Sequence, residues 1–300
     1  MGTPEFAVPS LDILVKNGYN VVAVITSTDK YGGRGGKKLL ESPVKRYAVE
    51  HDIPVLQPKN LKSPGFIEEL SSYKADLQMV VAFRMLPEVV WNMPPQGTYN
   101  LHGSLLPKYR GAAPINWAII NGDQVTGVTT FKLKHEIDTG DLILQKEVEI
   151  LDSDDAGNVH DKMMVIGAEA VLETIQLIES GKLEMKPQDA ALVSKAPKIF
   201  HEDCEINFEN KGVDIINFIR GLSPYPAAWM TIDDREMKIF KAQWQPFNHN
   251  ISCGKIFTDN KTQLSIFCND GIISVEDIKV QGKKRMDIKS YLNGNTILLK

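Results

Sequence analysis

Short apolar runs alternate with amphipathic helical segments through the first half of the chain, and this alternation restricts the fold more than any other feature. The apolar runs cover residues 21–26, 53–58, 77–83 and 98–102. Near-continuous apolar runs of this length are typical of strands buried on both faces of a parallel sheet. Strands and helices in alternation therefore predict an α/β fold with a doubly wound, mostly parallel, Rossmann-like sheet.

Three serines mark the expected starts of the first helices. Ser10 precedes an amphipathic segment that ends at a glycine, while Ser42 and Ser63 each stand directly before a proline. A serine side chain can accept a hydrogen bond from the first helical turn, and proline is favoured at the first helical position. A longer helix is predicted for residues 159–178, with Gly181 as its terminator.

The pattern changes after Cys204. One helical segment, residues 213–222, is followed by short strand candidates that turn residues separate. These candidates cover residues 227–232, 237–244, 254–258, 264–268 and 271–280. Many short strands in succession are typical of a small β-barrel, here of the OB-like kind. We therefore predict an N-terminal domain at residues 1–184, a linker at 185–203 and a C-terminal β-barrel domain at 204–300.

The composition disfavours several classes of protein. Charged residues make up 24% of the 300-residue chain and the formal net charge is −4, so there is no general basic excess of the kind seen in nucleic-acid binders. The three cysteines are far apart and lack C-x-x-C spacing, which predicts neither a disulfide framework nor a zinc site and fits the cytoplasm. No apolar run approaches the roughly 20 residues of a membrane span, and the first residues lack the pattern of a secretory signal.

The most distinctive stretch runs from Asn100 to Pro114 and reads NLHGSLLPKYRGAAP. Asn100 and His102 lie two positions apart at the expected end of a strand, so their side chains project from the same face. In doubly wound sheets, ligands bind outside the carboxyl ends of the strands. The amide and the imidazole are therefore candidates for one shared binding point.

A second polar stretch, IDTGD, lies between two strand-like runs and contains Asp138. Taken alone, a turn of this kind is an ordinary loop, and a solitary histidine or asparagine is most often structural. Together, an amide, an imidazole and a carboxylate can serve a carbonyl under attack: Asn100 and His102 would donate to the oxyanion, and Asp138 would assist His102 and accept protons. No serine or cysteine stands among them as a clear nucleophile, so the pattern favours direct acyl transfer to an attacking group of a substrate.

The stretch NLHGSLLPKYRGAAP followed by IDTGD resembles the folate-dependent formyltransferases. The similarity extends along nearly the whole chain through GTPEFAVPSL, GRGGKK, VVAF, GDQVTGVT, LSPYPAAW and GKKRM. It implies an enzyme with its catalytic domain at residues 1–184, which transfers the formyl group of 10-formyltetrahydrofolate to the α-amine of initiator methionyl-tRNA for translation initiation. It also implies a tRNA-binding C-terminal domain, no metal, a cytoplasmic location and a monomer.

The resemblance assigns roles to particular residues. Asn100, His102 and Asp138 match the catalytic residues of the family. The positions that match its folate site are Ser104, Leu105, Leu106 and Pro107 in the loop, and Val81, Ala82 and Phe83 at the end of the preceding strand. A flat, partly apolar heterocycle favours an apolar slot with backbone groups at its rim. Arg84 departs from the family pattern, because a glycine is commoner there, and we expect the mouth of the folate pocket to differ.

Two basic stretches are candidates for contacts with tRNA. In the family, a mobile glycine-rich loop enters the acceptor arm of the tRNA, and an arginine of this loop is important. The matching basic residues are Arg34, Lys37 and Lys38. The C-terminal domain contributes Lys283, Lys284 and Arg285. An arginine can bind phosphate bidentately and stack on a base, and adjacent cations bind phosphates regardless of sequence. From composition alone, a solvated surface loop or turn is the more common explanation of both stretches.

Two other functions stay open from the residues alone. The same catalytic groups would serve another 10-formyltetrahydrofolate-dependent formyltransferase, or a hydrolase, with an amino-sugar nucleotide or water as the acceptor. A glycinamide-ribonucleotide enzyme is disfavoured, because GTPEFAVPS lacks a glycine-rich phosphate loop. A non-enzymatic RNA-binding protein is disfavoured as well, because the second domain lacks an aromatic-rich RNA-recognition signature and the role of Asn100, His102 and Asp138 would be unexplained.

The family has an apolar strand directly before the sequence GTP, whereas Met1 stands directly before it here. A sheet without a buried central strand would expose apolar neighbours and unpaired backbone groups. We therefore expect that this strand is missing from the sequence.

Overall fold

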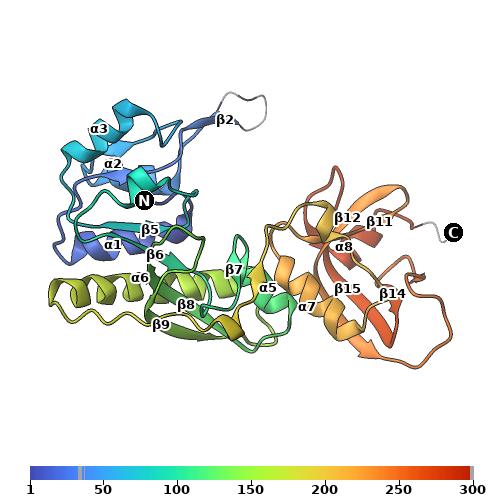
Figure 1. Cartoon of the computed structure of the whole chain (residues 1–300). Helices are drawn as coiled ribbons and strands as arrows, with labels where there is room; N and C mark the ends of the chain where they lie inside the picture. The colour runs from blue at the N-terminus through green and yellow to red at the C-terminus, as the bar shows by residue number, and fades with distance from the viewer. Residues whose placement is uncertain (33–35, 37, 298–300) are drawn as a thin grey trace. The chain divides into compact units, whose positions relative to one another are not determined.

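The computed structural model describes residues 1–32, 36 and 38–297 (Figure 1). The chain forms two compact units. The N-terminal unit comprises Met1–Gly111, Gly127–Val148 and His160–Lys195, and the C-terminal unit comprises Ala112–Thr126, Glu149–Val159 and Ala196–Lys300. The C-terminal unit thus includes two internal segments besides the last part of the chain. The domain and linker boundaries proposed above stay a prediction.

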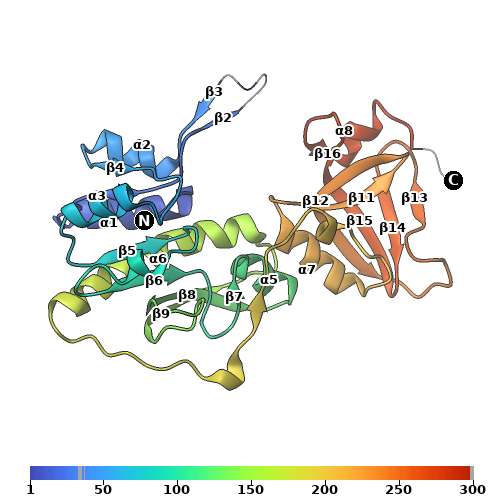
Figure 2. The same ribbon diagram turned by 45° about the horizontal axis from the view of Figure 1, so that its top comes forward.

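Four strands of the N-terminal unit lie within the predicted apolar runs, two flank the stretch IDTGD as expected, and two more lie in the glycine-rich stretch, where no strand was predicted. They are β1 (Val24–Ile25), β2 (Lys30–Gly32), β3 (Lys38–Leu40), β4 (Val55–Leu56), β5 (Gln78–Val81), β6 (Thr98–His102), β8 (Val125–Lys132) and β9 (Leu142–Glu149). β1 pairs with β4 in parallel, and β5, β6, β8 and β9 form a sheet in which β5 and β6 are parallel and β8 runs antiparallel to β6. β2 and β3 form an antiparallel hairpin that stands off the sheet (Figure 2). The predicted Rossmann-like α/β class is confirmed, with β8 as an antiparallel addition beside β6.

The first two residues connect the pair β1–β4 to the rest of the sheet. The Met1 ammonium donates to the Met79 carbonyl at 2.6 Å, and the Met1 carbonyl accepts from the Val81 N–H at 2.9 Å. On the other side, the Gly2 N–H donates to the Ile25 carbonyl at 3.1 Å. Burial lowers the pKa of the Met1 ammonium to about 5. Beside Met1, between β1 and β5, lies a mainly apolar cavity of about 430 Å³.

The helix starts of the N-terminal unit agree only in part with the prediction. The helices are η1 (Glu5–Ala7), α1 (Val8–Lys16), α2 (Pro43–Glu50), α3 (Pro64–Ser72), α4 (Glu88–Trp91) and α6 (Ala156–Glu179). Ser42 caps α2 as predicted, since its hydroxyl accepts from the Lys45 N–H at 3.0 Å, whereas Ser63 precedes α3 without a cap bond. The prediction for Ser10 is wrong. A proline in the first turn of α1 lets the helix begin earlier, at Val8, and places Ser10 inside it.

α6 is the longest helix described and covers one face of the sheet (Figure 2). Four residues of this helix near helical spacing are fully buried: Val159, Met163, Ala170 and Thr174. The Thr174 hydroxyl is 2.6 Å from the Thr130 hydroxyl of β8. Gly167 lies against Leu101 of β6, so closely that a Cβ at this glycine would be 2.8 Å from a Leu101 methyl. The helix therefore occupies the face of β6 toward which Leu101 points.

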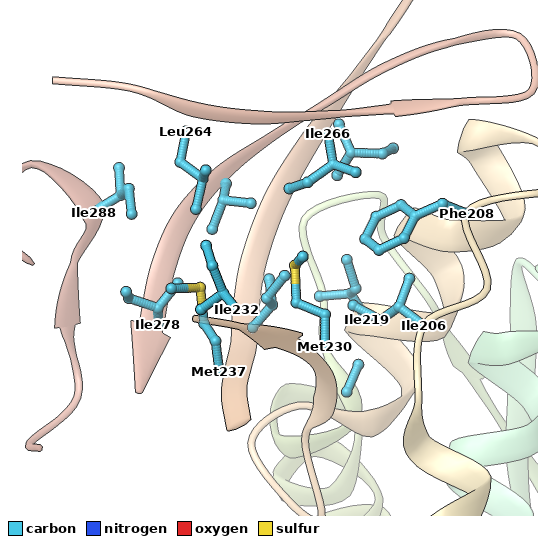
Figure 3. Close-up of a cluster of buried hydrophobic side chains, with 14 of the residues drawn as sticks. Ile206, Phe208, Ile219, Met230, Ile232, Met237, Leu264, Ile266, Ile278 and Ile288 are labelled. Carbon is cyan, nitrogen blue, oxygen red and sulfur yellow. The ribbon is translucent and has the colours of Figure 1, made fainter. Parts of the chain in front are cut away.

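The C-terminal unit is built on an antiparallel sheet. Its strands are β11 (Ala228–Ile232), β12 (Arg235–Pro246), β13 (Ile256–Thr258), β14 (Leu264–Cys268), β15 (Gly271–Val280) and β16 (Met286–Asp287), and its helices are α5 (Pro114–Ile120), α7 (Gly212–Leu222) and α8 (Ile288–Leu292). The strand order is β11-β12-β15-β14-β13, and β16 pairs with β15. Figure 3 shows the apolar core, to which Ile219 of α7, Met230 of β11 and Ile266 of β14 contribute. This arrangement confirms the prediction of a small barrel-like domain.

The remaining elements are one-turn helices and a short strand pair. They are β7 (Arg110–Gly111), β10 (Lys195–Ala196), η2 (Ala190–Leu192) and η3 (Glu202–Cys204). β7 pairs with β10. In the part of the chain that the structure describes, no helix is both long enough and apolar enough to cross a membrane.

Candidate functional site

β6 brings two of the predicted catalytic residues to the carboxyl end of the sheet. Asn100 lies opposite Phe131 of β8, and His102 lies opposite Thr129. Leu101, between them, points to the face that α6 covers. Asn100 and His102 therefore share the other face, as their spacing predicted.

The His102 ring is buried and has a partner at each nitrogen. Nε2 lies 2.9 Å from the Tyr109 carbonyl, and Nδ1 lies 3.9 Å from Oδ2 of Asp138. Because a carbonyl only accepts hydrogen bonds, Nε2 carries the hydrogen of the neutral ring, and Nδ1 turns its lone pair toward Asp138. The side chains of His102 and Asp138 are only 7% and 13% exposed. A lone pair and a carboxylate at this distance form a site for a proton or for a bridging donor.

Asp138 lies in the loop between β8 and β9, where its backbone is left-handed with φ of 55°. Aspartate tolerates this conformation better than most residues. Its Oδ2 atom accepts a hydrogen bond from the Gly111 N–H at 2.9 Å. Gly140 is required in the same loop, because a Cβ there would lie 1.8 Å from the Lys132 carbonyl. The glycine of the stretch IDTGD thus serves a close approach of two backbone segments.

The Asn100 side chain faces the same loop. Phe131, its cross-strand neighbour, points to the same side of the sheet. Gly140 packs against that phenyl ring, since a Cβ at the glycine would be 2.7 Å from Phe131 Cδ2. Within the described residues, the Asn100 amide makes no hydrogen bond. Its N–H groups are therefore available to a ligand.

The loop after β6 holds the predicted folate residues in different environments. The Thr129 hydroxyl donates to the Ser104 carbonyl at 2.6 Å and accepts from the Leu106 N–H at 3.0 Å. The side chains of Ser104 and Leu106 are buried, at 0% and 2% exposure, so these residues help to fix the loop. Leu105 is only partly buried, and Pro107 is buried after a cis peptide bond.

The second group of predicted folate residues lies at the end of β5. Val81 is buried and pairs with Leu101 of β6, so Ala82 comes next to His102 on the neighbouring strand. Ala82 is exposed and has φ of 48°, and Phe83 is partly buried. The carboxyl end of the sheet therefore combines apolar side chains with accessible backbone.

Arg84 follows these residues and does not extend freely into solution. Its guanidinium donates to the carbonyls of Pro58 and Lys59 and lies 5.7 Å from the centre of the Phe83 ring. The arginine therefore connects Phe83, one of the predicted folate residues, to the segment that follows β4.

Three residues around the site have left-handed backbone although none is glycine. They are Ala82, Tyr109 and Asp138, with φ of 48°, 60° and 55°. Such conformations cost on the order of 1 to 3 kcal/mol each and persist where surrounding contacts hold them, often at functional sites. Tyr109 is held through its carbonyl by His102, and Asp138 through its carboxylate by Gly111.

The structure describes four of the six residues that were predicted to contact tRNA. Arg34 and Lys37 are outside the described residues, and Lys38 is exposed on β3. In the C-terminal unit, Lys283 donates to Asn295 and Arg285 forms an ion pair with Asp277 at 2.6 Å. Lys284 is exposed and has no ion pair within the described residues. The three adjacent cations therefore differ in how far the protein itself engages them.

Two residues of the site, Arg110 and Gln188, were not predicted from the sequence. Gln188 donates to the backbone carbonyls of Asp138 and Gly140, and its own carbonyl accepts from Arg110. It lies in the segment interpreted as a linker, where the loss of periodicity gave no signal of a role. In the described part of the chain, no group of His, Cys, Asp and Glu side chains is arranged to hold a metal ion.

Comparison with known proteins identifies the family of the chain. Residues 1–175 match the formyl transferase family, and residues 198–296 match the formyl transferase C-terminal domain. The methionyl-tRNA formyltransferase of Parabacteroides distasonis is 53% identical over 304 residues, covering 98% of this chain and 94% of that protein. The protein of the same name from Flavobacterium johnsoniae is 48% identical over 301 residues, covering 99% and 95%.

Solved structures show the same architecture. An N-formyltransferase from Helicobacter canadensis, in complex with folinic acid and dTDP-3-aminofucose, superposes with a TM-score of 0.64 at 22% identity, covering 95% of this chain and 97% of that one. A sugar 3N-formyl transferase in the presence of dTDP and 5-N-formyl-THF gives a TM-score of 0.67 at 21% identity, covering 94% and 97%. These likenesses concern the fold. Together with the family match over more than half of the sequence, they lead to one conclusion: the chain belongs to the formyl transferase family.

Proposed function

We propose that this protein transfers the formyl group of 10-formyltetrahydrofolate to the α-amine of methionyl-tRNA. The observation that carries the proposal is the buried pair of His102 and Asp138 beside the Asn100 amide, which makes no hydrogen bond within the described residues. It occurs in a chain that shares 53% of its residues with a methionyl-tRNA formyltransferase over nearly its whole length. The three residues act as the catalytic groups.

The attacking amine loses a proton when its nitrogen bonds to the formyl carbon, and Nδ1 of His102 accepts it. The Nε2–H group is held by the Tyr109 carbonyl, so Nδ1 is the ring nitrogen with a lone pair. Once protonated, Nδ1 faces the Asp138 carboxylate, which compensates the new positive charge. His102 thus donates to an oxyanion only in its protonated form, which narrows the role expected from the sequence.

Asn100 supplies the donor that needs no prior proton transfer. Its amide N–H groups stabilise the formyl oxygen as it becomes an oxyanion. The bond between the formyl carbon and the folate nitrogen then breaks, and His102 returns its proton to that nitrogen as a general acid. The proton taken from the amine therefore leaves with tetrahydrofolate.

We place the folate at the carboxyl ends of β5 and β6. Val81, Ala82 and Phe83 supply one wall, and the loop at residues 104–107 supplies the other. Ser104 and Leu106 are buried and hold the loop in place through Thr129, so we place the partly buried Leu105 against the ligand. An apolar slot rimmed by backbone groups suits a flat heterocycle with polar edges.

We assign tRNA binding to the two basic stretches, with Arg34, Lys37 and Lys38 in the first, and Lys283, Lys284 and Arg285 in the second. Exposed Lys and Arg side chains bind phosphates through charge. We further propose that the protein acts as a monomer in the cytoplasm. The free thiols of Cys204, Cys253 and Cys268 are compatible with that reducing compartment.

The acceptor is tested by measuring formyl transfer from 10-formyltetrahydrofolate to methionyl-tRNA, free methionine, a dTDP-linked amino sugar and water. We expect rapid transfer to methionyl-tRNA alone. The sugar is included because related folds carry sugar formyltransferases. Faster transfer to the sugar nucleotide, or hydrolysis that ignores the tRNA, would exclude the proposed acceptor.

The catalytic groups are tested by the variants His102→Ala and Asp138→Ala. Loss of a general acid–base pair should lower kcat by about 10²- to 10⁴-fold, while tRNA binding changes little. The measurements are single-turnover formylation and a filter-binding assay with the charged tRNA. A variant with the wild-type rate would remove that residue from the mechanism.

A further inference from the structure

The Asp138 loop is held by a segment that follows α6. In this segment, which we call the strap (residues 183–189), Lys186 pairs with Leu142 at the start of β9 through two backbone hydrogen bonds of 2.7 and 2.9 Å. The strap thereby runs beside the strand that begins directly after the loop. Gln188, two residues further on, is partly buried among exposed neighbours.

The Gln188 side chain makes four hydrogen bonds. Its Nε2 atom donates to the carbonyls of Asp138 and Gly140, each at 2.8 Å. Its Oε1 atom accepts from Nε and Nη2 of Arg110, at 3.0 and 2.6 Å. A primary amide has two N–H donors and one oxygen with two lone pairs, so its capacity is fully used. The partners also fix its orientation, because carbonyls only accept and a guanidinium only donates.

These bonds act on the backbone that aims the Asp138 carboxylate. Asp138 has left-handed φ, and the two carbonyls that Gln188 joins belong to Asp138 and to the second residue after it. Gln188 therefore fixes the curvature of the turn on both sides of Thr139. These positions lie outside the helices and strands of the described chain. The Gln188 amide therefore supplies hydrogen bonds to the loop carbonyls that a helix or a sheet would otherwise supply.

Arg110 connects the same loop to His102. The residue before it, Tyr109, accepts from His102 Nε2 through its carbonyl, and the residue after it, Gly111, donates to Asp138 Oδ2. Residues 109–111 thus contact both members of the catalytic pair through their backbone. The side chain of Arg110 then ties this tripeptide to Gln188 and, through it, to the loop.

We propose that Gln188 is a positioning residue that acts through Asp138, and that Arg110 is its anchor. The inference rests on the proposed function, since it concerns how the acid–base pair is oriented. Gln188 keeps the carboxylate directed at His102 Nδ1 without contacting the substrates. A displacement of about 1 Å in such a group can cost about 100-fold in rate, so loss of the amide should reduce kcat by about 10- to 100-fold.

The central test compares Gln188→Ala with its neighbour Asp189→Ala. Asp189 caps the short helix after the strap by accepting from the Ala191 N–H at 2.9 Å, so its removal disturbs the strap but leaves the amide in place. We expect Gln188→Ala to lower kcat with KM values for folate and tRNA within about threefold, and Asp189→Ala to leave kcat unchanged. Equal losses of kcat in both variants would show a merely structural role for the strap.

A third variant, Gln188→Glu, distinguishes the bonds that the side chain donates to the loop from the bonds that it accepts from Arg110. Glutamate keeps an acceptor for Arg110 but cannot donate to the two loop carbonyls. If positioning depends on these carbonyls, Gln188→Glu should lose as much kcat as Gln188→Ala. Wild-type turnover in Gln188→Glu would overturn the proposal.

A double-mutant cycle with Asp138→Asn distinguishes this inference from the proposed function. If Gln188 acts through Asp138, adding Gln188→Ala to Asp138→Asn should lower kcat by less than about twofold. Full additivity of the two losses would refute the inference while leaving the proposed function intact. Wild-type activity of Asp138→Asn itself would instead refute the role of Asp138 in the proposed function.

Hydrogen exchange gives a readout that needs no turnover. Amides of the loop at residues 138–141 should exchange at least about tenfold faster in Gln188→Ala than in the wild type or in Asp189→Ala. Unchanged exchange in Gln188→Ala would show that the amide does not hold the loop, and would overturn the proposal even if the rates of chemistry were too low to compare.

Discussion

The two nitrogens of His102 have different surroundings, and this difference separates stability from chemistry at one residue. Nε2 holds the backbone of Tyr109 in a left-handed conformation, whereas Nδ1 faces a carboxylate across 3.9 Å. A substitution that keeps one nitrogen and removes the other can therefore tell the two roles apart.

The variant His102→Gln makes this separation. Its amide nitrogen can reach the position of Nε2 and donate to the Tyr109 carbonyl, but nothing replaces Nδ1. We expect a free energy of unfolding within about 1 kcal/mol of the wild type, and a kcat reduced by about 10²- to 10⁴-fold. Urea unfolding and single-turnover formylation measure the two quantities. If His102→Gln retained turnover, proton transfer at Nδ1 would be excluded.

At the scale of elements, three serines near helix starts have three different environments. Ser42 accepts from the Lys45 N–H and shares a hydrogen bond with the buried Thr26 hydroxyl. Ser63 makes no cap bond to the described helix that follows it. Ser10 is buried inside α1, and its hydroxyl has no partner among the described residues.

These environments predict three different effects of substitution by alanine. Ser42→Ala should lower the free energy of unfolding by about 1 to 2 kcal/mol, because a helix cap and a buried hydrogen bond are lost. Ser63→Ala should stay within about 0.5 kcal/mol of the wild type. Ser10→Ala should be neutral or stabilising by up to about 1 kcal/mol, since it removes an unsatisfied buried hydroxyl and improves helix propensity. Urea denaturation measures all three variants, and equal losses would contradict the different roles of these serines.

The turn between β15 and β16 carries three adjacent cations, of which two are engaged within the protein. Lys283 bonds to Asn295, and Arg285 pairs with Asp277 and lies 4.1 Å from the centre of the Phe240 ring. Lys284 is exposed and remains available to phosphate. Three neighbouring charges in the sequence therefore differ in their accessibility to a ligand.

Lys284→Ala should weaken tRNA binding and lower the slope of log K against log salt concentration by about 1, since one phosphate contact is lost. The matched control is Lys261→Ala, which removes an exposed lysine from another turn of the same unit. Binding is measured at several salt concentrations. Identical slopes in both variants would remove Lys284 from the tRNA interface.

At the scale of the whole molecule, a chain that begins at Met1 has a buried ammonium group that links its stability to pH. Burial lowers its pKa from the ordinary value of 8.0 to about 5. The unfolded chain then holds this proton up to about pH 8, while the folded chain releases it above about pH 5. Raising the pH through this window therefore favours folding.

The size of this effect can be measured against an Nα-acetylated chain, in which the charge is absent. Relative to that control, the free energy of unfolding of the free-amine chain should rise by about 4 kcal/mol between about pH 5 and about pH 8. The acetyl group has room in the adjacent cavity, and other titrating groups cancel in the comparison. If the free energies of unfolding of the two chains changed with pH in parallel, the lowered pKa of the Met1 amine would be contradicted.

The sequence predicted the elements that a local pattern determines. The run at residues 98–102 is the strand Thr98–His102. Its pattern was sufficient for the prediction, because Tyr99 and Leu101 alternate with Asn100 and His102 as expected of a strand. The run at residues 21–26 is reduced to Val24–Ile25, because strand length depends on what lies alongside. The spacing of Asn100 and His102 placed both on one face, but nothing local indicated which nitrogen of His102 is free.

Gln188 shows where sequence reasoning ends. Its partners Asp138 and Arg110 are 50 and 78 residues away in the chain. No spacing rule connects such positions, and the surrounding segment has neither helical nor strand periodicity. A side chain whose role arises only from distant contacts is recognised only when the chain is folded.

The position of Met1 has a practical consequence for preparing the protein. Met1 lines the apolar cavity between β1 and β5 and its amine is bonded to the Met79 carbonyl, so a peptide joined ahead of Met1 would start beside this cavity. A polyhistidine or glycine-serine leader would thread polar, flexible chain into that space, whereas a few valine or isoleucine residues would extend the pleat and find backbone partners on both sides. Affinity handles for purification therefore belong elsewhere in the chain.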